Sequence, residues 1–145
     1  MDDSSRAETA DRGEPAVRSP TTLSASFGHA WDGFRYVVKT QRNMQIHLFA
    51  ALAVIAAGLY LGLEWMRWAV LGLTIGFVLV SEMFNTVAEA ALDAATPHYH
   101  PLVKVAKDVA AGAVLVTSLI AAIVGLLVIG PPLWAKIAEW LGLAS

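Results

Sequence analysis

The sequence predicts an all-α membrane protein in which three transmembrane helices follow an amphipathic surface helix. Hydrophobic residues make up 57% of the 145 residues and charged residues only 15%, which is too apolar for an ordinary soluble domain. Three long apolar runs cover about 46–63, 68–92 and 105–129. Each run can cross a hydrocarbon core of roughly 30 Å, which takes about 20 helical residues. The chain has no cysteine, which excludes a disulfide framework and a thiolate metal site.

The N-terminal part has two different patterns. Residues 1–22 are polar, contain two prolines and show no apolar period, so we expect a disordered cytoplasmic tail. Over residues 24–40, apolar residues recur with a helical period, and charged residues lie on the opposite face. The apolar face is formed by Phe27, Trp31, Phe34 and Val38. This pattern is typical of an amphipathic helix that lies in a membrane interface, and we treat 23–130 as one membrane domain.

The links between the apolar runs suggest how the spans are arranged. Residues 64–67 are expected to form a short first link, so the first two spans are antiparallel. Residues 94–101 form the second link, where Pro97 and Pro101 prevent a continuous helix. We expect Pro131-Pro132 to end the third span, which leaves 131–145 as a short C-terminal interfacial segment.

Basic residues predict the orientation in the membrane. Lysines and arginines are concentrated before the first span and at the second link. The first link and the C-terminal end carry few of them. The positive-inside rule therefore places the N-terminus and the second link in the cytoplasm.

A polar stripe runs along the second span. It consists of Glu82, Asn85, Thr86, Glu89 and Asp93. At about 100° per residue these side chains fall within roughly 60° of one line along the helix. A carboxylate costs on the order of 3 kcal/mol near a bilayer centre, so such residues normally face a bundle interior, a cavity or a partner.

The predicted orientation brings further polar residues to the same leaflet. Glu82 lies roughly 20 Å along the helix from Trp68, in the cytoplasmic half of the bilayer. One face of the third helix carries Lys104, Lys107, Asp108 and Ala111. His47, near the start of the first span, is interpreted as an interfacial residue and not as a catalyst.

These side-chain types suit phosphoryl transfer to a membrane alcohol. Carboxylates with an amide can hold Mg²⁺, a lysine can stabilise phosphate oxygens, and a deeper carboxylate can accept a proton from a lipid hydroxyl. The chain has no GxxxxGK[ST] phosphate loop. From the residues alone, a cation or proton pathway and polar residues that only set oligomer packing remain alternatives.

Paired motifs in the second and third spans resemble a known signature. The first is Glu82-x-x-Asn85-Thr86-x-x-Glu89-x-x-x-Asp93, and the second is Ala106-Lys107-Asp108-x-Ala110-Ala111-x-Ala113-Val114. Together they resemble the prokaryotic diacylglycerol kinase and undecaprenol kinase family, and the likeness extends over about 23–129. The resemblance implies a small lipid kinase of the bacterial plasma membrane that uses ATP and Mg²⁺ and binds no nucleic acid. It also implies a homotrimer with composite sites between neighbouring chains.

The resemblance also implies roles for individual residues. Glu82 would be the general base on the lipid hydroxyl, Glu89 would bind the metal carried by the nucleotide, and Asn85 would shape the same pocket. Expected contacts of the lipid substrate are Trp31, Glu82, Asn85 and Ala111. Expected contacts of the nucleotide are His29, Gln41, Glu89, His98, Tyr99, His100, Lys107 and Asp108.

Two features refine this expectation. Gln41 stands where the family often has a glutamate that is a second metal ligand, so we expect Gln41 to be a weaker ligand without charge. The segment Arg42-Asn43-Met44-x-Ile46-His47 looks more like the undecaprenol kinase branch, which favours undecaprenol over diacylglycerol as substrate. The alternative from another class is a non-catalytic membrane module or an ion-binding transporter.

Overall fold

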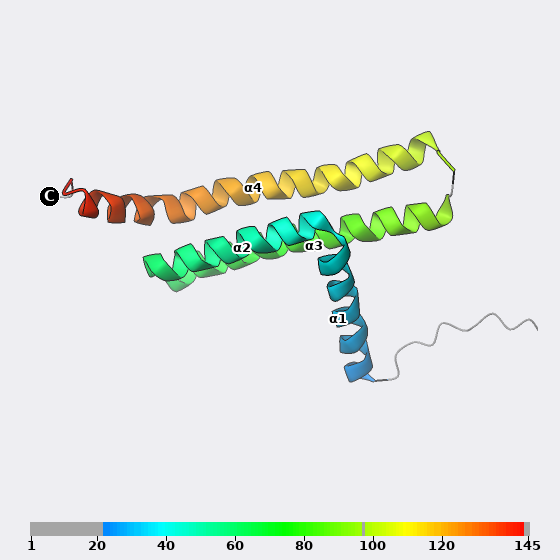
Figure 1. Cartoon of the computed structure of the whole chain (residues 1–145), viewed down its shortest axis with the longest axis horizontal. Helices are drawn as coiled ribbons and strands as arrows, with labels where there is room; N and C mark the ends of the chain where they lie inside the picture. Colours follow the sequence, from blue (N-terminus) through cyan, green and yellow to red (C-terminus); the bar gives the residue numbers. More distant parts are fainter. Residues whose placement is uncertain (1–21, 97, 144–145) are drawn as a thin grey trace, which may run out of the picture. The chain divides into compact units, whose positions relative to one another are not determined.

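The computed structural model describes residues 22–96 and 98–143, and within these ranges the chain is entirely helical outside short links. The helices are α1 (Leu23–Thr40), α2 (Arg42–Leu61), α3 (Trp65–Ala95) and α4 (Pro101–Trp140), drawn in Figure 1. The last three are long and apolar enough to cross a membrane. The prediction of three spans preceded by a shorter helix is therefore confirmed. The tail predicted at 1–22 lies outside the described residues except for Thr22.

The described part of the chain divides into two compact units after Gly33. In the first unit, the Thr22 hydroxyl accepts a hydrogen bond of 3.3 Å from the backbone N–H of Ala25 and so caps the start of α1. Phe27 and Trp31 of α1 are exposed, as expected for aromatic anchors of a surface helix. The second unit contains the rest of α1 and the other three helices.

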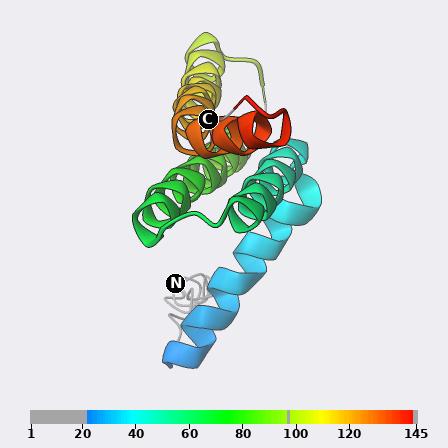
Figure 2. The same cartoon turned by 90° about the vertical axis from the view of Figure 1, so that its left-hand side faces the viewer.

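Helices α2, α3 and α4 pack side by side in the second unit. Helix α3 runs along α4, and α2 contacts both (Figure 2). The buried apolar side chains of this bundle include Met44, Leu71, Val78 and Val114, whereas most large apolar side chains of these helices are exposed. An apolar outer surface of this extent is expected where a protein contacts lipid.

A glycine turn connects α2 to α3. Gly62 has a φ of 65°, and its N–H and that of Leu63 donate to the carbonyls of Leu59 and Gly58, which is a Schellman motif. Because this motif ends α2 and no breaker follows it, α3 already begins at Trp65. The prediction that 64–67 form the link is therefore wrong by a few residues, and the link is Gly62–Glu64.

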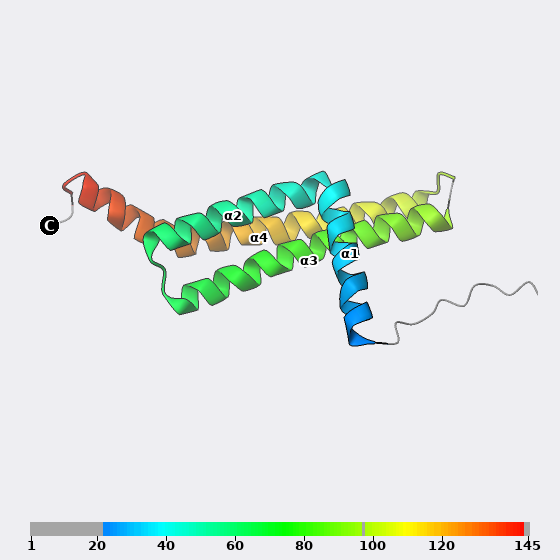
Figure 3. The ribbon, with the colours of Figure 1, turned by 60° about the horizontal axis from the view of Figure 1, so that its bottom comes forward.

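The third long helix continues through its two prolines, so the predicted helix end at Pro131-Pro132 is wrong. Figure 3 shows α4 changing direction toward its C-terminal end but not breaking. A proline at 132 has no N–H for the carbonyl of Val128, four residues earlier. Nη1 of Arg67 in α3 donates to that carbonyl at 3.4 Å, so the carbonyl keeps a hydrogen-bond partner.

We expect the Arg67→Met variant to lose about 1 kcal/mol of stability, because the Val128 carbonyl then has no donor. In a Pro132→Ala background the same substitution is expected to have little effect, since the N–H of the new residue can reach Val128. Apparent melting temperatures of the four proteins in one detergent measure the coupling. Equal losses in both backgrounds would show that Arg67 acts elsewhere.

Candidate active site

A groove of about 330 Å³ lies where α2, α3 and α4 meet. Its lining residues are Asn43, Ile46, His47, Glu82, Asn85, Glu89, Ala111, Val114, Leu115 and Ser118. Four of them, Glu82, Asn85, Glu89 and Ala111, are site residues predicted from the sequence. The structure thus brings together most of the polar stripe of α3 with the facing residues of α4.

Glu82 is the most deeply buried charged residue of this groove, with 1% of its surface exposed. Its backbone carbonyl accepts a hydrogen bond of 2.9 Å from the hydroxyl of Thr86, one turn later on α3. Among the described residues, however, nothing donates to Oε2 of its carboxylate. An unpaired buried carboxylate oxygen is costly, so the site is suited to a ligand that donates a hydrogen bond.

Asn85 and Glu89 form a second polar pair on the same helix. Nδ2 of Asn85 donates to Oε1 of Glu89 at 3.3 Å. This contact leaves Oδ1 of Asn85 buried and without a partner in the part of the chain that the structure describes. Glu89 is half-buried. The groove therefore presents acceptor oxygens from three residues of α3.

The structure adds two residues that sequence reasoning did not assign to the site. The hydroxyl oxygen of Ser118 is buried and has no hydrogen-bond partner within the described ranges. Ser118 lies seven residues after Ala111, two turns along the same face of α4, and that spacing was the available signal. His47 also lines the groove and is half-buried, and its interpretation as an interfacial residue and not a catalyst stays a prediction.

Lys107 and Asp108 do not line the groove. Nζ of Lys107 contacts a carboxylate oxygen of Asp93 and thereby joins α4 to α3 near the second link. Asp108 is paired instead with Lys104 on its own helix, with 2.5 Å between Nζ and Oδ2. Each of the two charges predicted to meet a nucleotide is thus paired with another side chain of the chain, Lys107 with Asp93 and Asp108 with Lys104.

The remaining predicted nucleotide contacts lie in the links. Nδ1 of His100 accepts a hydrogen bond of 3.3 Å from the N–H of Leu102 and caps the start of α4. His98 and Tyr99 are exposed beside it. Gln41 is half-buried between α1 and α2 and does not line the groove.

His29 and Trp31 lie on α1 in the first unit, and their contacts with nucleotide and lipid stay predictions. Among the described residues, no group of three or more histidine, aspartate or glutamate side chains is placed to hold a metal ion. The oxygens of Asn85 and Glu89 are nevertheless of the type that a hard cation prefers, so they fit part of a Mg²⁺ shell.

The fold and the groove define a multi-pass membrane protein with a polar site inside its helical bundle. Residues 28–129 match the family described as prokaryotic diacylglycerol kinase. The chain belongs to this family of lipid kinases, which confirms the resemblance and favours an enzyme over a non-catalytic module or transporter.

Three relatives show the range of the family. The chain is 46% identical to a diacylglycerol kinase of Synechocystis sp. over 77% of its own length, and it spans 64% of that protein. It is 43% identical to the undecaprenol kinase of Bacillus subtilis over 74% of its length and 88% of that protein. It is 35% identical to a diacylglycerol kinase of Helicobacter pylori, over 70% and 80% of the two chains. Two different lipid substrates are thus named among relatives of similar identity.

Proposed function

We propose that the chain transfers the γ-phosphoryl group of ATP to the hydroxyl of a membrane lipid at the cytoplasmic leaflet, with undecaprenol as the preferred acceptor. The observation that carries this proposal is the group of three unpaired buried oxygens in the groove. They belong to Glu82, Asn85 and Ser118. A lipid hydroxyl entering the groove would supply a donor for one of these oxygens, Oε2 of Glu82.

The proposed reaction needs little covalent chemistry from the protein. Glu82 would take the proton of the lipid hydroxyl as the oxygen attacks the γ-phosphorus and ADP leaves. Glu89 and Asn85 would hold Mg²⁺, which neutralises phosphate charge. Lys107, once released from Asp93, would be free to contact phosphate oxygens.

A homotrimer is part of the proposal. Of the eight predicted nucleotide-binding residues, all within the described ranges, only Glu89 lines the groove of a single chain. This partial set supports a site that a neighbouring chain completes. The orientation that goes with it places the N-terminus and the second link in the cytoplasm, where ATP is available.

One observation in the groove supports undecaprenol. Asn43, Ile46 and His47, from the segment that resembles the undecaprenol kinase branch, form the α2 wall of the groove beside Glu82. The identity of 46% to the Synechocystis protein keeps diacylglycerol as the second candidate.

An adjoining apolar cavity gives this preference a physical basis. It has a volume of about 280 Å³ and shares His47 and Ser118 with the groove. Its other lining residues are Ala50, Ala51, Val54, Leu71, Thr74, Ile75, Val78, Leu79, Ala121, Ala122 and Gly125. The cavity can take the first carbons of one lipid chain. Undecaprenol carries a single chain next to its hydroxyl, whereas diacylglycerol carries two.

A competition assay tests the proposal. With radiolabelled ATP, Mg²⁺ and equal amounts of undecaprenol and diacylglycerol in micelles, we expect undecaprenyl phosphate as the main product. The Ala121→Leu variant, which narrows the cavity, is expected to lower kcat/KM for undecaprenol about tenfold and to affect diacylglycerol less.

The matched control is Ala56→Leu, at an exposed position of α2 that lines neither cavity. It is expected to behave as wild type. Phosphatidic acid as the main product would replace undecaprenol by diacylglycerol, and the absence of any labelled lipid would contradict the kinase assignment for this chain.

A further inference from the structure

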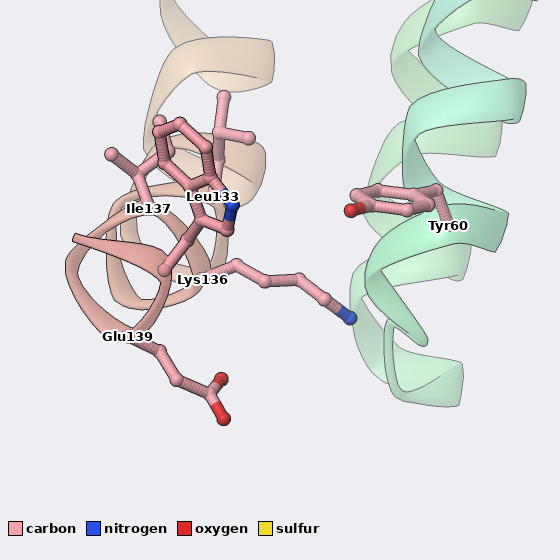
Figure 4. Close-up of a pocket in the computed structure, with 6 residues that line it drawn as sticks. Tyr60, Leu133, Lys136, Ile137 and Glu139 are labelled. Carbon is pink, nitrogen blue, oxygen red and sulfur yellow. The ribbon is translucent and has the colours of Figure 1, made fainter. Parts of the chain in front are cut away.

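The end of the bundle away from Glu82 contains a second hollow, of about 520 Å³. One wall is Tyr60 in the last turn of α2, and the other is the C-terminal part of α4 beyond its two prolines (Figure 4). The α4 residues are Leu133, Lys136, Ile137, Glu139 and Trp140. None of them takes part in the proposed phosphoryl transfer, so the hollow calls for a separate explanation.

Two opposite charges in this hollow lack a charged partner. Nζ of Lys136 lies 4.9 Å from the centroid of the Tyr60 ring, which is a cation–π contact. Within the ranges that the structure describes, neither Lys136 nor Glu139 forms an ion pair, with each other or with another residue. Figure 4 shows Lys136 reaching across the gap to Tyr60, with Glu139 projecting from α4. The hollow thus presents one cation and one anion, three residues apart.

The surroundings of the hollow indicate its depth in a membrane. Trp134 and Trp140 are exposed on this part of α4, and Trp65 is exposed at the start of α3. Indole rings concentrate where lipid headgroups meet the hydrocarbon core. Leu133 and Ile137 add an apolar lining beside the charges. The hollow therefore has charged groups and apolar walls at the level of phospholipid headgroups.

We infer that this hollow binds the headgroup of a zwitterionic phospholipid, phosphatidylethanolamine. The ammonium group of Lys136 contacts the lipid phosphate, and the carboxylate of Glu139 contacts the lipid amine. Leu133 and Ile137 contact the glycerol and the first chain carbons. An anionic headgroup would satisfy Lys136 but would meet repulsion from Glu139, and this charge pattern is the basis of the choice.

Lipid retention tests the inference without ATP or undecaprenol, so its outcome is separate from that of the proposed kinase activity. The full chain in detergent is incubated with equal amounts of phosphatidylethanolamine and phosphatidylglycerol, and the lipid that stays bound is identified by native mass spectrometry. Wild type is expected to retain phosphatidylethanolamine in preference. Lys136→Ala is expected to retain about fivefold less of it, as for one lysine at a membrane surface.

Two further variants complete the experiment. Glu139→Gln removes the anion and is expected to bind phosphatidylglycerol at least as well as phosphatidylethanolamine. Lys104→Ala removes an exposed lysine at the other end of α4 and is expected to retain lipid as wild type does. Equal retention by wild type and Lys136→Ala would overturn the inference, as would a wild-type preference for phosphatidylglycerol.

Discussion

Replacing Glu82 by Gln is expected to reduce lipid phosphorylation about a thousandfold, within the usual range for loss of a general base. The substitution keeps the size of the side chain and its position one turn before Thr86. The amide can still hydrogen-bond to a lipid hydroxyl but cannot accept its proton. We therefore expect the loss in kcat, with KM for the lipid little changed, in assays at saturating ATP and Mg²⁺.

A stability measurement separates this effect from misfolding. The carboxylate of Glu82 is buried and one of its oxygens has no partner among the described residues. Glutamine carries no charge, so the variant avoids the free-energy cost of burying a carboxylate. The melting temperature of Glu82→Gln is therefore expected to be no lower than that of wild type. The control is Glu64→Gln, at an exposed carboxylate that pairs with Arg67 at the other end of α3. Wild-type turnover by Glu82→Gln would contradict its role as the base.

The groove was partly predictable because charge inside an apolar run is costly and so stands out in the sequence. Glu82, Asn85 and Glu89 were found this way, and the structure places all three in one groove. The ends of the stripe were less predictable. Asp93 pairs with Lys107 instead of facing the groove, and such pairing depends on how α3 and α4 are offset along each other.

Ser118 shows why other site residues escape sequence reasoning. Hydroxyl side chains in membrane helices commonly donate to their own backbone. Thr74 and Thr117 do so here, with distances of 2.7 and 3.0 Å to the carbonyls of Val70 and Ala113. A serine in an apolar helix therefore stands out only by its spacing from other site residues, here two turns after Ala111 on the same face of α4. Only the packing of α2 and α3 against α4 identifies Ser118 as a buried hydroxyl without a partner.

A residue distant in the sequence supports one of the two carbonyls that the prolines of α4 leave without a backbone donor. The local rule that two prolines end a helix is sound where the freed carbonyls have no other donor. Arg67 supplies that donor to Val128 from 61 residues away, across the interface between α3 and α4. The same continuation brings Lys136 to Tyr60 and so forms the second hollow.

Replacing Glu89 by Gln is expected to raise the Mg²⁺ concentration for half-maximal activity by about tenfold or more. Substitution of residues that only hydrogen-bond to a metal ligand lowers metal affinity about 10–100-fold. Loss of a ligand's own charge is expected to lower it at least as much. The glutamine can still accept the hydrogen bond from Nδ2 of Asn85, which keeps the local geometry. Activity measured over a range of Mg²⁺ at fixed ATP gives the shift.

The matched control for Glu89 is Asp93→Asn, because Asp93 lies on the same helix but outside the groove. Loss of the Asp93 charge releases Lys107. We therefore expect the Asp93→Asn variant to change KM for ATP and not the Mg²⁺ requirement. An unchanged Mg²⁺ requirement in Glu89→Gln would remove Glu89 from the metal site.

The Gln41→Glu variant adds a negative charge, whereas Glu89→Gln removes one. It tests whether residues outside the groove of a single chain contribute to the metal shell. Gln41 lies between α1 and α2 and does not line the groove of its own chain. In a homotrimer with composite sites, the new carboxylate would complete a shell with Glu89, and the Mg²⁺ requirement would fall below that of wild type. The double variant Gln41→Glu with Glu89→Gln would then recover part of the loss. If instead Gln41→Glu leaves the Mg²⁺ requirement unchanged in both backgrounds, Gln41 is not part of the metal shell.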